Sequence, residues 1–364
     1  MTSLHVDLGR QWRGGQHQAL LLLRGLQARG HLAALLAVEG APLAERAQVE
    51  GILVHTVGRR AVRLQAAARL RQLLRQQQFD VLHLHDAHAL TAAWLVRACR
   101  RTCVLASRRV AYRLQSNPVS LSRYRAAHRV LAISRFVAET VRAAGIPADR
   151  VEVVYDGVDF PSLPPTAMHH SARRRWGVAD KEKLIGCVGY LVPGKGQEFL
   201  LRALPTVLKQ FPTCRLLLIG DGPCRPQLER LVRQLGLQSA VSLAGFVDDL
   251  AQVYSALDVF VFPSLLEGLG TSLLAAMSYA LPVVAVGQDA GLEVVEDGRN
   301  GLLVPASDPA ALASALVRLL GDAELAARLG AAARETIQQR FTADRMVENT
   351  LRIYQQVSSA GVPA

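Results

Sequence analysis

The sequence has little of what marks an exported or membrane-spanning chain. Its five cysteines are an odd number without the paired spacing of a zinc site, so we expect buried thiols in a reducing compartment. The first eight residues lack a basic start and a long apolar run, so no signal peptide is expected. Arg24 and Pro282 interrupt the longest apolar stretches, which leaves none of bilayer-spanning length. These absences predict a cytoplasmic chain that is soluble or peripheral to a membrane.

Acidic residues are scarce in the first part of the chain. Residues 1–150 contain 23 arginines, no lysine and 8 acidic residues, a net charge of +15, whereas the remainder carries 19 basic and 22 acidic residues, a net charge of −3. So basic a domain favours an anionic partner: a bilayer surface, a phosphorylated acceptor or nucleic acid. No recognition motif accompanies the charge, so nucleic acid is the least favoured of the three.

The composition and the alternation of elements predict an α/β protein of two domains. Half of the 364 residues are apolar, which is enough for two full cores, and short apolar runs alternate with helical segments in both parts. This alternation predicts parallel sheets covered by helices. Prolines and the change in charge balance predict an N-terminal domain over 1–160, a linker over 161–175, a second domain over 176–340 and a closing helical segment over 341–364.

The most informative stretch runs from Ala256 to Val286. It begins with a short apolar run that predicts a strand buried on both faces, and Pro263 ends this run because proline has no amide donor for the ladder. A glycine loop follows, and then a segment of helix-forming composition up to residue 280. Thr271 and Ser272 are expected to cap that helix. The sequence therefore predicts strand, glycine loop, helix and a further strand.

Such a loop suits a phosphorylated ligand. Amides at a helix N-terminus are unpaired and lie at the positive end of the helix dipole, and Gly268 and Gly270 let an anion approach them closely. Glu267, just ahead of these amides, is suited to accept hydrogen bonds from the hydroxyls of a sugar. An ordinary strand-to-helix turn, with glycines for tight packing, accounts for this segment equally well.

The N-terminus carries a second glycine loop. A strand over residues 4–8 is followed by Gly14 and Gly15, and a helix is expected over 19–29. Two glycines before a helix suggest that a ligand approaches the backbone, and Arg10 and Arg13 suit an anion there.

Histidines gather around a strand near residue 83. Strand alternation places His83 and His85 on one face, with Asp86 and His88 at the C-terminal end, where open α/β sheets bind their ligands. The spacing His-x-His-Asp-x-His differs from the metallo-hydrolase pattern His-x-His-x-Asp-His by one exchanged position. We therefore expect no metal here, and Asp86 either orients His85 or caps the next helix.

The second half carries a series of short motifs in a fixed order. They are Gly189 with Lys195-Gly196, Gly220-Asp221-Gly222-Pro223, Gly245-Phe246, Pro263-Ser264 with Glu267-Gly268-Leu269-Gly270, Pro282-Val283-Val284, and Glu296-Asp297-Gly298 with Asn300-Gly301-Leu302-Leu303-Val304. Over residues 184–305 this series resembles the donor domain of retaining GT-B glycosyltransferases of family 4, which include lipopolysaccharide-core and mannosyl transferases. The first half resembles the family's acceptor domain through Gly14-Gly15, His85-Asp86 and residues 153–159.

The resemblance implies two Rossmann-like, doubly wound domains facing across a cleft, and a donor site for a nucleotide sugar. Lys195 would neutralise the diphosphate, Glu267 would bind sugar hydroxyls, and the pair Gly14 and Gly15 would close on the diphosphate from the first domain. The final helix would cross back to the first domain. The implied donor-binding residues are Gly14, Gly15, Tyr190, Lys195, Gly220, Asp221, Gly245, Phe246, Glu267, Gly268, Leu269, Gly270, Thr271 and Ser272. The implied catalytic residues are Glu267, Lys195, His85 and Arg109.

Three positions depart from the family pattern. Ala275 stands where a second glutamate usually binds the ribose, and Tyr190 stands where an arginine commonly contacts the diphosphate. A histidine often follows the fifth strand, near the anomeric carbon, where this chain has Arg108 and Arg109. Either arginine is a candidate for the positive charge there, and His85 remains a candidate beside the reacting centre.

These observations predict a metal-independent, retaining hexosyl- or heptosyltransferase acting on an envelope glycan or glycolipid acceptor of the lipopolysaccharide type. No Asp-x-Asp motif is present, and Asp248-Asp249 is expected to be a turn or a helix start. The basic first domain would lie at the inner face of the membrane. Two alternatives stay open: a catalytically silent nucleotide-sugar-binding relative, and a nucleotide-sugar epimerase. A dinucleotide dehydrogenase is disfavoured because Gly220-x-Gly222 lacks the third glycine.

Overall fold

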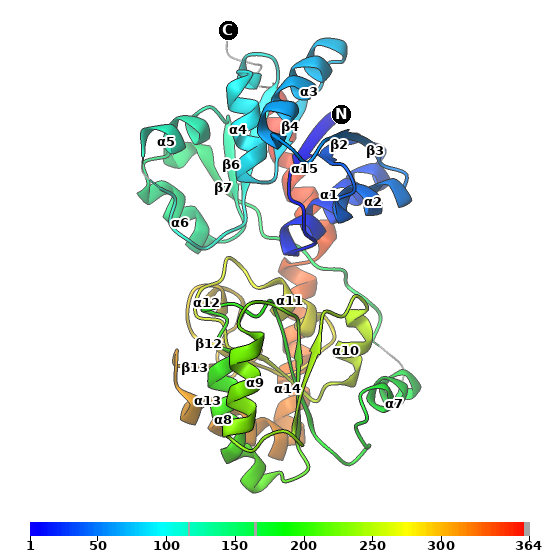
Figure 1. Cartoon of the computed structure of the whole chain (residues 1–364), viewed down its shortest axis with the longest axis vertical. Helices are drawn as coiled ribbons and strands as arrows, with labels where there is room; N and C mark the ends of the chain where they lie inside the picture. Colours follow the sequence, from blue (N-terminus) through cyan, green and yellow to red (C-terminus); the bar gives the residue numbers. More distant parts are fainter. Residues whose placement is uncertain (116, 164–165, 360–364) are drawn as a thin grey trace. The chain divides into compact units, whose positions relative to one another are not determined.

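A computed structural model of the chain describes residues 1–115, 117–163 and 166–359. The chain divides into two compact units, one formed by Met1–Gly157 with the segment from Ala343 onward, the other by Val158–Thr342. Each unit has its own parallel sheet covered by helices (Figure 1). In the part of the chain that is described, no helix combines the length and the apolar character needed to cross a bilayer.

The first unit is a Rossmann-like domain. Within the described residues its sheet has seven strands in the order β3-β2-β1-β4-β5-β6-β7, and every pairing is parallel. The strands are β1 (Thr2–Asp7), β2 (Leu32–Val38), β3 (Leu53–Val57), β4 (Val81–Leu84), β5 (Cys103–Arg108), β6 (Arg129–Ala132) and β7 (Val151–Val153). The helices are α1 (Gly14–Ala28), α2 (Pro42–Val49), α3 (Val62–Gln76), α4 (Ala87–Leu95), α5 (Pro118–Arg125), α6 (Arg135–Ala143) and α15 (Ala343–Ser359), with short 3-10 helices at Ala98–Arg100 and Ala148–Arg150.

The last helix of the chain completes the core of this unit. Helices α1 and α15 lie side by side, and apolar residues of both pack with the central strands β4, β5 and β6. Gly25 permits this approach, because a β-carbon there would lie 2.4 Å from a methyl group of Val347. The first unit is therefore assembled from two distant parts of the sequence.

The second unit repeats the same architecture. Its sheet, in the described residues, has six parallel strands in the order β10-β9-β8-β11-β12-β13. The strands are β8 (Leu184–Val188), β9 (Arg215–Ile219), β10 (Val241–Gly245), β11 (Val259–Phe262), β12 (Val283–Val286) and β13 (Leu302–Val304). The helices are α7 (Thr166–Arg175), α8 (Gln197–Gln210), α9 (Arg225–Gln234), α10 (Leu250–Ala256), α11 (Thr271–Ser278), α12 (Ala290–Val294), α13 (Pro309–Gly321) and α14 (Ala323–Arg340). Apolar residues of α8, α9 and α13 form the main core against the sheet.

The strand order places one binding edge in each unit. In both sheets the direction of winding reverses between two neighbouring strands, β1 and β4 in the first unit and β8 and β11 in the second. Open α/β sheets bind ligands beyond the carboxyl ends of the strands at such a switch point. The residues that follow these four strands are therefore the candidates for ligand binding and catalysis.

The expected α/β class with two Rossmann-like domains is confirmed, but several local expectations were wrong. Helix α1 begins at Gly14, not near residue 19, so both glycines lie in its first turn, where amides need no helical partner. Helix α4 ends at Leu95, before a left-handed Arg97 (φ 51°). Helix α2, which starts with Pro42 at its first position, was not predicted.

The proposed linker over 161–175 contains a helix. Helix α7 occupies its second half, and buried Arg173 fixes it by donating to Asp258 at 3.0 Å. Pro164 and Pro165, two of the prolines that suggested a linker, lie outside the described residues, as do residues 360–364 of the expected closing segment.

Candidate active site

In the second unit, the loops after the two switch-point strands meet. The loop after β8 carries Lys195, the loop after β11 carries Glu267, and the ammonium group of Lys195 donates directly to the Glu267 carboxylate. Both side chains remain about one quarter exposed. A backbone hydrogen bond of 2.8 Å from Leu265 to Gly194 ties the same two loops together. The structure therefore joins the two residues to which the sequence assigned the diphosphate and the sugar.

Glycines allow these loops to pack backbone against backbone. Gly196 has φ +73°, and a β-carbon there would lie 1.9 Å from the carbonyl oxygen of Pro263. Gly270 has φ +83°, and a β-carbon there would lie 2.6 Å from the ring of Phe262. A side chain at either position would force the loops apart, so these glycines are required by geometry.

Helix α11 presents its N-terminus at this edge, but without the expected caps. The capping position is Gly270, and the side chains of Thr271 and Ser272 lie in the first turn and do not cap the helix. A left-handed backbone fits glycine and not threonine, which explains the shift by one residue. Gly268 and Leu269 are buried beneath the turn. The first-turn amides of α11 thus have no side-chain cap, as an anion site requires.

Two further loops flank the Lys195–Glu267 pair. Gly220 donates its amide to the carbonyl of Gly245 at 2.8 Å, and Asp221 accepts from Leu191 through its carbonyl at 2.9 Å, so the predicted motifs interlock. Beside them, Tyr190 and Phe246 are 42% and 63% exposed. Large exposed aromatic rings are suited to stack on a nucleotide base.

One residue of this edge escaped the sequence analysis. Asp289, after β12, has the left-handed φ of 45°, which is rare for a residue with a side chain. Burial raises the pKa of its carboxyl group, and a hydrogen bond from the backbone amide of Glu267 offsets only part of this shift. The other oxygen, Oδ2, is buried and has no partner among the described residues. Asp289 thus holds the Glu267 loop in place, and its unusual backbone conformation is the feature that distinguishes it from other acidic residues.

In the first unit, three imidazoles form a buried chain at the switch point. His5 pairs in register with His83 across β1 and β4, and His85 follows β4. Within the described part of the chain, every ring nitrogen of the three histidines has a hydrogen-bond partner. The ring of His85 contacts Arg109 at 2.9 Å and His5 at 3.0 Å, and the other nitrogen of His5 contacts Ser3 at 3.1 Å. The ring of His83 contacts Tyr354 at 2.6 Å and Ser107 at 2.7 Å. A metal ion at these rings would have to displace these bonds. The sequence pointed to His83 and His85, but not to His5.

Arg109 fixes the proton positions along this chain. Because a guanidinium only donates, Nδ1 of His85 accepts, its Nε2 donates to His5, and His5 in turn donates to Ser3. Burial lowers the pKa of all three imidazoles, that of His5 to about 3, and the charge of Arg109 adds to the effect. His85 is therefore neutral, and its Nδ1 accepts a hydrogen bond from Arg109.

Arg109 itself lies beside the start of α1. Its Nε donates to the buried carboxylate of Asp156 at 3.0 Å, and Gly15 comes so close that a β-carbon there would lie 3.9 Å from Cδ of Arg109. Burial raises the pKa of Asp156, whereas the Arg109 charge lowers it and offsets part of the shift. Arg109, His85 and the Gly14-Gly15 turn are thus brought together. Asp156 lies in the segment 153–159 that contributed to the family resemblance, but no role of its own was predicted for it.

Neighbouring candidates have structural roles. Arg108 is buried and donates to the hydroxyl of Tyr124 and the carbonyl of Tyr112, which ties its loop to α5. Asp86 caps α4 by accepting from the amides of His88 and Ala89. Ala275, at the position of the missing glutamate, is half-buried in α11.

The imidazole chain makes stability depend on pH. The pKa of His5, His83 and His85 is lower in the folded chain than in the unfolded chain. As the pH falls below about 6.5, the unfolded chain therefore binds protons that the folded chain does not, and the free energy of unfolding decreases. Asp7 opposes this effect, since burial and then Asp86 raise its pKa to about 6. The raised pKa of Asp156 acts in the same direction. The three imidazoles have the larger effect between about pH 7 and about pH 6, because the unfolded pKa of histidine lies in that interval. We expect a net loss of about 1–2 kcal/mol from about pH 7 to about pH 6. Thermal unfolding at the two pH values measures it, and an unchanged midpoint would contradict the neutral chain.

Both units match family models of glycosyltransferases. Residues 12–160 match the model described as Glycosyltransferase Family 4, and residues 182–322 match the model described as Glycosyl transferases group 1. An uncharacterized glycosyltransferase of Methanocaldococcus jannaschii is 30% identical over 300 residues, 78% of this chain and 76% of that protein. The phosphatidyl-myo-inositol mannosyltransferase of Mycobacterium leprae is 32% identical over 303 residues, 81% of this chain and 78% of that protein.

The same likeness holds for solved structures. The Anabaena protein HepE, solved in complex with UDP-glucose, superposes with a TM-score of 0.87 over 98% of this chain and 100% of that chain, at 21% sequence identity. At this identity the likeness concerns the fold, which is the two-domain arrangement that the motif series indicated.

Proposed function

The chain belongs to the GT-B glycosyltransferases of family 4, and from this premise we propose that it transfers a hexose or heptose from a nucleotide sugar to an envelope glycan or glycolipid. We further propose that the transfer retains the anomeric configuration and needs no metal ion. The observation that carries the proposal is the contact of Lys195 with Glu267 at the switch point of the second unit, beside the uncapped start of α11.

These residues supply what the donor half of the reaction needs. The departing nucleoside diphosphate carries growing negative charge, and Lys195 together with the first-turn amides of α11 stabilises it without a metal. Glu267 accepts hydrogen bonds from the sugar hydroxyls and so orients the ring. Phe246 and Tyr190 offer ring faces to the base. UDP is bound by HepE, and we propose a nucleoside diphosphate of this kind for this chain.

In the first unit we assign the charge beside the reacting centre to Arg109. Asp156 and His85 hold its guanidinium through Nε and Nη1, and among the described residues nothing bonds its Nη2. This nitrogen is left to donate to substrate. His85 then acts through Arg109, as a positioning residue, and takes no proton itself.

The acceptor side is basic and partly apolar at its surface. Helix α3 has Arg63, Arg69, Arg71 and Arg75 and no acidic residue, and its Leu64 is 66% exposed. Basic and apolar side chains on one helix favour an anionic bilayer surface. The Mycobacterium leprae relative acts, by its name, on phosphatidyl-myo-inositol. We propose that this chain meets a glycolipid acceptor of the lipopolysaccharide type at the inner face of the membrane.

A donor-binding screen tests the proposal. The purified full chain is heated with UDP, GDP, ADP or their sugar conjugates, each with and without EDTA, beside Glu267→Ala. We expect one nucleotide to raise the unfolding midpoint, with EDTA having no effect and Glu267→Ala abolishing the sugar conjugate's advantage over the nucleotide. No stabilisation by any nucleotide would favour the silent relative, and donor consumption without acceptor would favour the epimerase. Product of inverted configuration would refute retention.

A further inference from the structure

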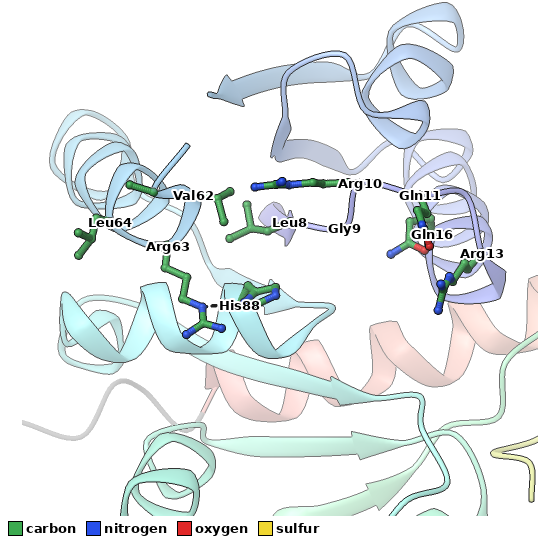
Figure 2. Close-up of a pocket in the computed structure, with 11 residues that line it drawn as sticks. Leu8, Gly9, Arg10, Gln11, Arg13, Gln16, Val62, Arg63, Leu64 and His88 are labelled. Atoms are coloured by element: carbon green, nitrogen blue, oxygen red, sulfur yellow. Dashed lines mark hydrogen bonds between the residues drawn. The ribbon is translucent and has the colours of Figure 1, made fainter. Parts of the chain in front are cut away.

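A pocket of about 790 Å³ opens in the first unit, and its lining includes Arg63 and Leu64 of helix α3, which we assigned to the acceptor side. Figure 2 shows its three sides: the loop after β1, the start of α3 and the start of α4. The volume is in the range of pockets for small molecules, about 300–1,000 Å³. The lining residues are Leu8, Gly9, Arg10, Gln11, Arg13, Gln16, Ala61, Val62, Arg63, Leu64 and His88.

The charged side chains of this lining all have the same sign. Arg10, Arg13 and Arg63 contribute guanidinium groups from two sides, and no carboxylate belongs to the lining. Asp7 and Asp86, which neighbour lining residues in the sequence, accept hydrogen bonds from backbone amides of the surrounding loops. The lining therefore carries positive charge, which a neutral sugar would not need.

Arg63 and His88 are held in a donating arrangement. Nε of Arg63 donates to Nδ1 of His88 at 2.7 Å (Figure 2). Nδ1 therefore carries no proton, and Nε2 of His88 carries one and is a donor. The terminal nitrogens of Arg63 have no partner among the described residues, so they remain available to a ligand.

The backbone adds to this positive charge. Helices α1 and α3 both begin at the pocket, neither has a side-chain cap, and neither has an acidic residue in its first turn. Ala61, which precedes α3, has a left-handed φ of 43°. Positive helix ends and guanidinium groups together form the chemistry that proteins use to bind phosphate.

We propose that this pocket binds a phosphate group of the sugar acceptor, so that the acceptor is a phosphate ester. The inference rests on the proposed function, since it assigns the pocket to the acceptor. The phosphate belongs either to a lipid headgroup or to a soluble phosphorylated molecule. The room beyond one phosphate accommodates the alcohol that the phosphate esterifies, and Arg63 and His88 are the contacts of the phosphate.

Titration with inorganic phosphate tests the site. The full chain carrying Lys195→Ala is used, so that the donor site contributes less, and binding is followed by calorimetry at low ionic strength. We expect Arg63→Gln to weaken phosphate binding by about tenfold, because a charge-assisted hydrogen bond is lost. Arg60→Gln is the matched control, since Arg60 is an exposed arginine near the pocket but not in its lining. Equal binding by Arg63→Gln and the parent, or equal losses in both variants, overturns the proposal.

Two further arms identify the source of the phosphate. Co-sedimentation with phosphatidylcholine vesicles, with and without phosphatidylglycerol, tests a lipid headgroup, and competition by glycerol 3-phosphate tests a soluble ester. A loss of vesicle binding in Arg63→Gln alone indicates the lipid, and competition without vesicle binding indicates the soluble ester. Nucleotide binding by the wild-type chain is measured in parallel. If it persists while phosphate binding is absent, the inference fails and the proposed function stands.

Discussion

Replacing Arg109 with alanine is expected to destabilise the first unit by about 3–5 kcal/mol and to reduce turnover by at least about a hundredfold. The loss of stability follows because the Asp156 carboxylate, 4% exposed, would be left buried without its counter-ion. The loss of turnover follows because Nη2 is the one nitrogen of this guanidinium left for substrate. Thermal unfolding and a steady-state assay, performed below the midpoint of the variant, measure the two effects separately.

A double variant separates structure from chemistry. Arg109→Met with Asp156→Leu removes both charges and fills the space with apolar groups, which often restores the stability that a broken buried pair loses. We expect the unfolding midpoint to recover and the turnover to stay low. Arg173→Met in the second unit is the control, because buried Arg173 also pairs with a carboxylate, that of the partly exposed Asp258, but away from either binding edge. Turnover that recovers with stability would reduce Arg109 to a structural residue.

Replacing Lys195 with alanine is expected to lower kcat/KM by about a hundred- to a thousandfold, because one preorganised cation for the leaving diphosphate is lost. The unfolding midpoint should change little, since Lys195 and Glu267 are about one quarter exposed and such pairs contribute little to stability. The binding of nucleoside diphosphate should weaken in parallel. Steady-state kinetics together with the nucleotide-dependent shift in the unfolding midpoint measure this result.

Lys183 and Glu267 provide the comparisons. Lys183→Ala removes another half-exposed lysine of the second unit, which lies 3.9 Å from Asp258, and should leave kinetics unchanged. Glu267→Gln keeps the shape of the side chain, and the double variant with Lys195→Ala should lose less than the sum of the single losses, because the two residues are in contact. Additive losses of kcat/KM in the double variant would show that the contact between Lys195 and Glu267 does not contribute to catalysis.

The sequence was most informative where function depends on backbone geometry. Gly196 and Gly270 could be predicted as site residues because two loops that pack this tightly leave no room for a side chain. The order of such glycines along the chain indicated the fold. The capping of α11 was misjudged because the left-handed turn at Gly270 takes the position that Thr271 would fill. Local propensity does not see that constraint.

Residues whose roles depend on distant partners were not predictable. His5 joins the imidazole chain because β1 pairs with β4, more than seventy residues later in the sequence. Asp156 has its role because it accepts a hydrogen bond from Arg109, which follows another strand. Arg63 and His88 lie in different helices and meet at one pocket. Such pairs are set by the strand order 3-2-1-4, and a single sequence gives that order only through resemblance.

The return of α15 to the first unit has a consequence for biosynthesis. After residue 157 the ribosome adds the 185 residues of Val158–Thr342 before it begins Ala343, a delay of roughly 10–40 s at about 5–20 residues per second. During this interval Leu21, Leu22 and Leu26 of α1 lack the helix that covers them. The second unit is complete before the first unit has its whole core. A nascent chain of this design exposes an apolar sheet face to chaperones until translation has almost ended.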